Sequence, residues 1–161
     1  MSSLPTPPTS APHGTSTAHG RSKTIAAWLA LVVGALGVHR FYLHGFKDKV
    51  GWLFPLPTFV GILGVHRMEE FGQDDRAAWV MIQWLGLSLA AAMLTAIRYG
   101  LTPDERWDAR FNASRPSNSG WVAIIAVILA VLLGGGILMA TIAFTSQRYF
   151  EYTMGDDNPL R

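Results

Sequence analysis

The stretch GALGVHRFYLHG, residues 34–45, places a His-Arg pair directly after an apolar run, and GILGVHR repeats that ending at residues 61–67. Each copy reads Gly-x-Leu-Gly-Val-His-Arg. Glycine lets the backbone of a neighbouring helix approach closely, and a charged pair is typical of the point where an apolar helix reaches water. We therefore interpret the two copies as the ends of two short apolar helices.

The composition favours a protein whose solvent is lipid. Half of the 161 residues are hydrophobic and 15% are charged, against about 25% charged in an average soluble domain. The Lys and Arg residues are spread over every connector and form no basic face with interleaved aromatic residues, so nucleic-acid binding is disfavoured. The chain has no Cys, which excludes disulfides and thiolate metal sites.

Four uncharged segments approach the length needed to cross a bilayer. A hydrocarbon core of about 30 Å needs roughly 20 helical residues. The segments 77–97 and 121–144 meet this length, whereas 24–38 and 50–65 fall short. The sequence therefore predicts an all-α integral membrane protein with about four transmembrane helices, the first two forming a short hairpin and both chain ends lying on one face.

The two short segments leave alternatives open. The first gains length if its helix continues past Arg40 and the guanidinium rises to the lipid headgroups. The second carries Pro55 and Pro57 near its start, where proline is tolerated in a first turn or as a kink. We favour a short tilted span over a re-entrant hairpin for residues 50–65. A cleaved signal peptide over residues 21–37 is a competing interpretation of the first segment.

The same reading divides the chain into six parts. The first is a Pro- and Ser/Thr-rich tail that buries too little apolar area to order itself, so we predict disorder there. The parts are the tail (1–20), a helical hairpin (21–70), a third transmembrane helix (77–98), a polar connector (99–120), a fourth transmembrane helix (121–145) and a polar C-terminal tail (146–161).

Small residues spaced four apart form three stripes, and such stripes mark contact faces between membrane helices. They are Ala26, Ala30 and Gly34; Ser88, Ala92 and Ala96; and Ala126, Ala130 and Gly134. We expect the three segments that carry them to pack together.

The polar connector contains a helix-start pattern. In TPDE, residues 102–105, Thr102 is the expected N-cap with Pro at the first helical position. Trp107 and Phe111 then share a face. An amphipathic helix on the membrane surface and a helix in a soluble loop both fit this pattern.

Basic residues favour an orientation only slightly. The turn 39–49 and the connector 98–120 hold seven Lys and Arg, whereas the N-terminal tail, the connector 66–77 and the C-terminal tail hold six. Short cytoplasmic loops are enriched in Lys and Arg. A count of seven against six does not decide the orientation, and it leans only weakly towards a cytoplasmic turn 39–49 and connector 98–120.

The stretch SKTIAAWLALVVGALGVHRFYLHG, residues 22–45, resembles the TM2 domain, a pair of short membrane helices. The matching positions are Lys23, Gly34, Gly37, His39, Arg40, Phe41, Tyr42 and Leu43. The chain departs at His44, where the family usually has glycine, and at the end of the second helix near residue 70. The resemblance implies a multi-pass membrane protein, with the bacterial plasma membrane as its expected location, and no established chemistry.

The repeated ending supplies the candidate interaction residues. They are Gly34, Gly37, His39, Arg40, Phe41 and Tyr42 in the first copy and Gly61, Gly64, His66 and Arg67 in the second. The glycines would allow helix contact, the arginines would meet phosphates or last-turn carbonyls, and the aromatic rings would anchor the interface. The alternative is a specific chemical role, in which His39 and His66 bind haem or a metal ion. We predict no metal and no cofactor, because no ligand cluster accompanies them.

Sequence motifs of catalysis are missing: the chain has no Walker loop, no dinucleotide fingerprint and no evident nucleophile triad. The acidic cluster fits a solvated connector; it consists of Glu69, Glu70, Asp74 and Asp75. We therefore expect no enzymatic activity and predict a module in the lipid bilayer that assembles with itself or with a membrane-protein partner. A small oligomeric channel or permease subunit is the alternative, although segments three and four carry no ionisable residue.

Overall fold

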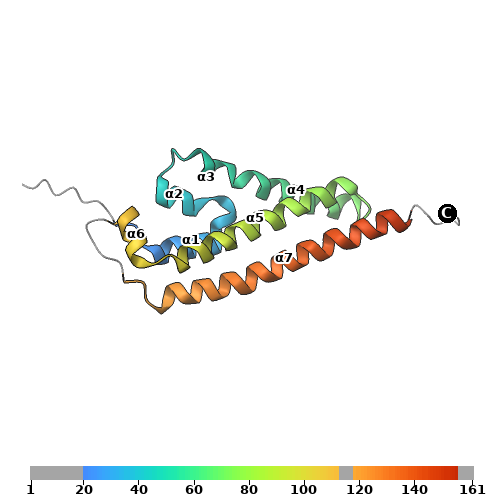
Figure 1. Cartoon of the computed structure of the whole chain (residues 1–161). Helices are drawn as coiled ribbons and strands as arrows, with labels where there is room; N and C mark the ends of the chain where they lie inside the picture. The colour runs from blue at the N-terminus through green and yellow to red at the C-terminus, as the bar shows by residue number, and fades with distance from the viewer. Residues whose placement is uncertain (1–19, 113–117, 156–161) are drawn as a thin grey trace, which may run out of the picture.

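The structure is a computed structural model, and it describes residues 20–112 and 118–155. The elements in chain order are α1 (Lys23–Val33), the 3-10 helix η1 (Gly34–Leu36), α2 (Val38–His44), α3 (Lys49–Leu53), α4 (Pro55–Phe71), α5 (Arg76–Leu101), α6 (Asp104–Phe111) and α7 (Trp121–Gly155). Every regular element within the described ranges is helical (Figure 1), which confirms the predicted all-α class.

The central helix is α5, and the other long elements pack along it (Figure 1). Helix α4 runs antiparallel to its N-terminal half, where Gly64 faces Met81 and Gly61 faces Leu85. Helix α7 follows the whole length of α5, and α1 covers the C-terminal half of α5. The short helix α6 closes the end at which α5 finishes and α7 begins.

The first segment folds back inside the bundle instead of continuing as one long helix. Gly34 lies against Ala92, about midway along α5, and Gly37 then adopts φ 74°, a left-handed conformation that suits glycine. Helix α2 returns to the end where α1 began, so the backbone N–H of Ser22 donates to the Tyr42 hydroxyl over 3.0 Å. The expected extension of the first helix past Arg40 is therefore wrong: the turn at Gly37 reverses the chain.

The tip of this hairpin is held by buried hydroxyl groups. Thr58 Oγ1 donates to the carbonyl oxygen of Ala35 over 2.8 Å and lies 2.7 Å from Ser88 Oγ. Both hydroxyl side chains are buried. In an apolar interior a turn is tolerated when protein groups satisfy its backbone, and Thr58 does so for η1.

The segment 50–65 does not turn back. Helices α3 and α4 are joined through Phe54, which itself has helical backbone angles, and Pro55 occupies the first turn of α4. This is the position where proline costs no hydrogen bond. A reversal of the chain occurs instead in the first segment, at Gly37.

The three stripes of small residues meet in the interior. Ala30, Ala96 and Ala130 have no exposed surface and pack in one cluster with Leu31 and Met93. The stripe on α7 continues to Gly134, where an added Cβ would come within 2.7 Å of the Met93 Cβ. Close approach of the three backbones, as predicted from spacing, therefore builds the core of the bundle.

Two helices, α5 and α7, are long and apolar enough to cross a membrane. That number is lower than the four predicted, because the hairpin returns at its tip and α4 has 17 residues. Helix α7 continues to Gly155, so the polar tail expected from residue 146 begins as helix. The tail 1–19 lies outside the described residues.

The two ends of the described chain lie at opposite ends of the bundle (Figure 1). At one end the backbone N–H of Arg21 donates to Asn112 Oδ1 over 2.6 Å. At the other, the Arg76 guanidinium lies over the Tyr152 ring, 4.2 Å from its centroid. The sequence predicts both chain ends on one face; in the bundle the described ends lie apart, because the hairpin of α1 and α2 returns to the end where it began.

Replacing Gly61 with Ala should lower the free energy of unfolding by about 1–3 kcal/mol, the usual cost of overpacking. The added Cβ would collide with the Cβ and backbone of Leu85. Gly135→Ala is the matched control, because a Cβ there meets nothing within 4 Å. Thermal unfolding in detergent, followed by tryptophan fluorescence, measures both variants. Equal midpoints would contradict the α4–α5 contact.

Candidate functional site

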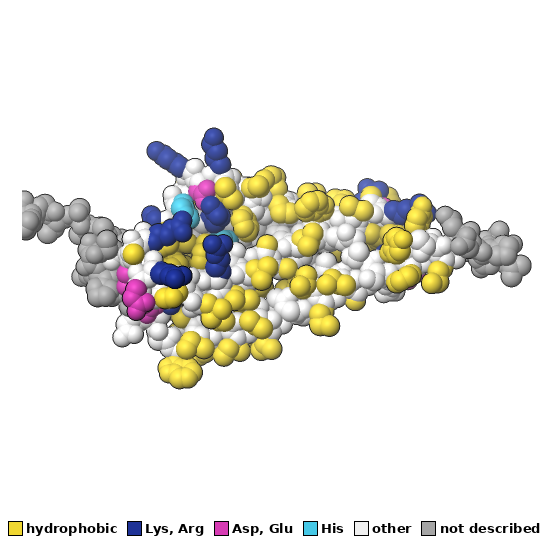
Figure 2. All heavy atoms as spheres, viewed as in Figure 1, with side chains coloured by type: hydrophobic (Ala, Val, Ile, Leu, Met, Phe, Trp, Pro, Cys, Tyr) yellow, Lys and Arg dark blue, Asp and Glu magenta, His cyan; other side chains and the backbone are white. Residues whose placement is uncertain are grey.

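An open cavity of about 820 Å³ lies at the end of the bundle where α2, α5 and α6 meet. Its lining combines apolar side chains such as Leu43 and Phe54 with basic ones, and includes neither Asp nor Glu among the described residues. The basic lining residues are His39, Arg40, His44, Arg98, Arg106 and Arg110. Figure 2 shows Lys and Arg side chains gathered over this end, with a broad apolar surface along the rest of the molecule.

Helix α6 is docked on the bundle by its aromatic face. Trp107 is 3% exposed, and its ring packs against Tyr99 and Phe111 with centroids 5.7 and 4.7 Å away. The indole N–H donates to the Arg21 carbonyl oxygen over 2.7 Å. The shared face predicted for Trp107 and Phe111 therefore contacts protein, and it holds Arg106 and Arg110 at the cavity.

The start of α6 differs from the expected one. Its N-cap is Pro103, and Thr102 instead caps the C-terminus of α5, where its hydroxyl donates to the Arg98 carbonyl oxygen over 2.6 Å. Thr102 could cap either the C-terminus of α5 or the N-terminus of α6. In the structure it caps α5.

A buried lysine joins the hairpin to α6. Lys23 Nζ lies 2.6 Å from Asp104 Oδ1 and donates to the Thr102 carbonyl oxygen over 2.9 Å. Asp104 also accepts the backbone N–H of Ser119 over 2.9 Å. The hydrogen bond from Lys23, and next the one from Ser119, lower the pKa of Asp104 to about 2. This pair holds the cavity wall in place at the start of α1.

The cavity wall nearest the hairpin tip contains His39. Its side chain is 1% exposed and packs edge-on against the rings of Phe54 and Tyr99, at 5.3 and 5.8 Å between centroids. Neither ring nitrogen has a hydrogen-bond partner among the described residues. Buried polar atoms are usually hydrogen-bonded. The ring nitrogens of His39 are therefore an exception, and they lie in the wall of the cavity.

One of the four cavity arginines has a carboxylate partner. Arg40 Nε lies 2.8 Å from Asp48 Oδ2, and His44 Nδ1 lies 3.8 Å from the same oxygen. The hydrogen bond from Arg40 lowers the pKa of Asp48. Arg40 therefore pairs with a loop carboxylate of its own chain, a contact in addition to the phosphates or last-turn carbonyls predicted from sequence.

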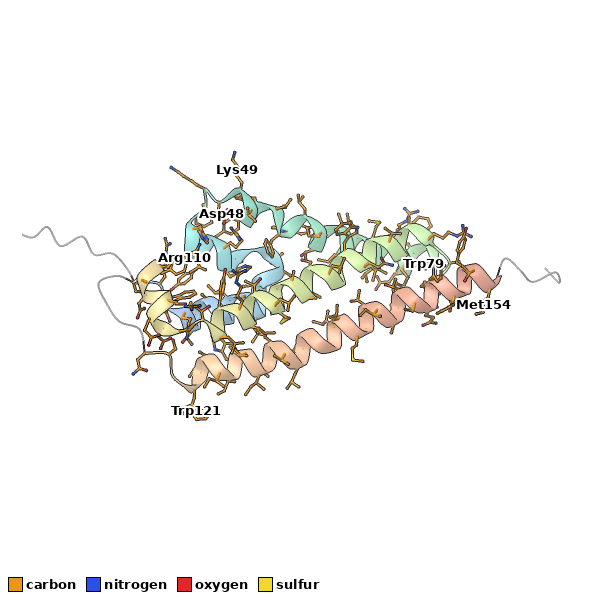
Figure 3. All side chains as sticks on the ribbon, in the orientation of Figure 1. Asp48, Lys49, Trp79, Arg110, Trp121 and Met154 are labelled. Carbon is orange, nitrogen blue, oxygen red and sulfur yellow. The ribbon has the colours of Figure 1, made fainter. Side chains whose placement is uncertain are left out.

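Arg98, Arg106 and Arg110 form no ion pair with any residue in the described ranges 20–112 and 118–155. Figure 3 labels Arg110 at the α6 end of the bundle. In the sequence, Arg98 follows the third apolar segment, and Arg106 and Arg110 belong to the polar connector. Arg106 and Arg110 are four residues apart and follow the same spacing as Trp107 and Phe111. This spacing was the signal in the sequence for a shared basic face.

Residues 19–57 match the family model of the TM2 domain. This range includes the hairpin, α3 and the first residues of α4. None of the curated proteins and none of the solved structures compared with the chain matches it. The TM2 domain and the two long apolar helices together indicate a membrane protein.

The aromatic residues of the TM2 motif pack within the domain. Phe41 lies against Phe46 and Trp52, with ring centroids 5.5 and 5.3 Å away, and the Tyr42 hydroxyl accepts from Ser22. A Cβ on Gly51 would come within 2.7 Å of the Phe41 ring. These rings therefore pack α2 against α3.

The second copy of the repeat lies outside the matched TM2 domain and at the opposite end of the bundle. His66 is exposed beside Glu69, 3.6 Å between Nδ1 and Oε2, and Arg67 pairs with Asp75, the N-cap of α5. His39 and His66 therefore cannot share a metal ion. The part of the chain that the structure describes contains no group of three or more potential metal ligands.

Acidification should destabilise the wild-type protein more than Asp104→Asn. The pKa of Asp104 lies at about 2 in the folded state against an ordinary 3.8, so its stabilisation is present above pH 3.8 and is lost as the pH falls to about 2. The variant lacks this contribution throughout, so the difference in thermal midpoint between the two proteins should shrink from pH 6 to pH 2.5. Glu105→Gln, the neighbouring acid, is the control. A difference independent of pH would contradict the Lys23–Asp104 pair.

Proposed function

We propose that this chain is a multi-pass integral membrane protein that acts without catalysis, as an assembly or interaction module. The observation that carries this proposal is the distribution of apolar side chains. The buried ones are mostly alanines, whereas large apolar residues on α4, α5 and α7 are exposed. A soluble domain buries large apolar residues and avoids such surfaces, so this distribution fits a bundle surrounded by lipid.

The charges at the two ends support one orientation in the bilayer. Eight described Lys and Arg lie at the cavity end: Arg21, Lys23, Arg40, Lys47, Lys49, Arg98, Arg106 and Arg110. Three lie at the opposite end: Arg67, Arg76 and Arg148. Because cytoplasmic ends are enriched in Lys and Arg, we place the cavity end in the cytoplasm, with a bacterial plasma membrane as the proposed location. The hairpin produces this asymmetry, because its reversal brings Arg40, Lys47 and Lys49 back to the end where Arg21 and Lys23 lie.

We accordingly propose three crossings, formed by α3 with α4, by α5 and by α7, together with one re-entrant hairpin. Reporter domains fused before Gly20 and inserted at Phe46 should report the cytoplasm, and a fusion at the C-terminus should report the opposite face. Equal membrane levels of the three fusions are the control. A reporter at Phe46 on the face opposite to Gly20 would mean that α1 crosses the membrane and would contradict the re-entrant hairpin.

The assembly role draws on α7. Its outward residues include Val131, Leu132 and Met139, all more than half exposed, and a Cβ on Gly135 or Gly136 would meet nothing within 4 Å. Such a face is open to lipid or to another helix. The channel or permease alternative has less support, because the sequence carries no ionisable residue between Arg76 and Arg98 or between Trp121 and Arg148.

Two differently tagged copies of the full chain, expressed together, should co-purify from membranes in a discrete complex. Membranes that contain each copy alone, mixed after solubilisation, are the control for association in detergent. Recovery of each tagged copy alone, with no stoichiometric membrane-protein partner, would contradict an assembly module.

A further inference from the structure

We infer that the cavity formed by α2, α5 and α6 binds the phosphate group of an anionic phospholipid. This inference rests on the membrane placement in the proposed function but not on assembly. Lipid phosphate and soluble phosphate share the chemistry that would recognise them. The cavity's position and its apolar walls favour the lipid as the source.

The charge of the cavity favours an anion. Arg98, Arg106 and Arg110 line one cavity with no acidic residue in its described lining, and Asp48 pairs with Arg40 and His44. Like charges held together repel one another, and a bound anion removes that repulsion. Arginine matches phosphate oxygens with two parallel N–H donors, so the side chains present suit a phosphate group.

His39 provides an independent reason to place a ligand here. It belongs to the lining, is 1% exposed, and has two ring nitrogens without a hydrogen-bond partner in the described part of the chain. A neutral imidazole has one N–H donor and one acceptor nitrogen. An anion seated against this wall supplies an acceptor for the N–H of this imidazole.

The remaining walls are suited to an amphiphile. Leu43, Phe54 and Leu101 line the same cavity, and its volume of about 820 Å³ falls within the usual range for ligand pockets. The cavity lies where α5 ends and the broad apolar surface gives way to basic side chains (Figure 2). At that level a phospholipid has its phosphate, with acyl chains toward the apolar surface. Basic pockets between membrane helices on the cytoplasmic side bind such headgroups.

The test uses the full chain in detergent, with native mass spectrometry to measure bound short-chain phosphatidylglycerol, phosphatidylcholine and inorganic phosphate at matched concentrations. Both lipids carry the same phosphate, but the choline cation of phosphatidylcholine would lie among the basic side chains of the cavity. Wild type should therefore bind phosphatidylglycerol about ten-fold more tightly than phosphatidylcholine, because like charges repel. The double variant R106Q/R110Q should lose this preference. R98Q provides a second variant, from a different helix, should the double variant fail to fold.

The matched control is K47Q/K49Q, which removes two positive charges from the same end. Both lysines are exposed and lie outside the cavity lining, and Lys49 points away from the bundle in Figure 3. It should keep the wild-type preference. An equal loss in K47Q/K49Q would mean general surface attraction and would overturn the site, as would a wild type without preference. Inorganic phosphate bound as tightly as phosphatidylglycerol would overturn the lipid as source. All of these results are independent of co-purification, so they separate this site from the assembly role.

Discussion

The turn at residues 34–37 determines which residues meet at the cavity end of this bundle. Gly37 takes a left-handed backbone conformation with the carbonyl of Gly51 and the side chain of Phe54 against it, so a side chain there would be both strained and crowded. Because the chain reverses at that point, α2 returns beside the start of α1. Arg40 and His39 then lie in the space that α5 and α6 enclose. A straight first helix would have carried both to the opposite end.

A reversal inside an apolar bundle needs partners for its backbone, and the sequence supplies them from elements far along the chain. Thr58 on α4 satisfies the Ala35 carbonyl, and Ser88 on α5 completes this buried polar contact. Lys23 and Asp104 close the open end of the hairpin. The TM2 domain therefore depends on α5 and α6, although its matched range ends at residue 57. This dependence explains why residues outside the domain form most of the basic cavity.

The two copies of Gly-x-Leu-Gly-Val-His-Arg share one property and differ in another. All four glycines occupy close approaches to a neighbouring element, against Ala92, Gly51, Leu85 and Met81. The His-Arg pairs have different surroundings: His39 is enclosed by Phe54 and Tyr99, whereas His66 faces solvent. Close helix contact depends on the small size of glycine, so both copies of the motif make it. The environment of a polar side chain depends on the rest of the fold, so the His-Arg pairs of the two copies have different surroundings.

The sequence by itself determined the helical class, the two long apolar helices, the contact stripes and the resemblance to the TM2 domain, because each follows from composition or from spacing along one helix. Only the tertiary structure decided where the first segment turns, on which end of the bundle each charge lies, and which arginines share a space. Arg98 and Arg110 are twelve positions apart and Arg40 is far from both, and their convergence depends on the reversal at Gly37 and on the docking of Trp107. Those are contacts between elements, which no local pattern of residues specifies.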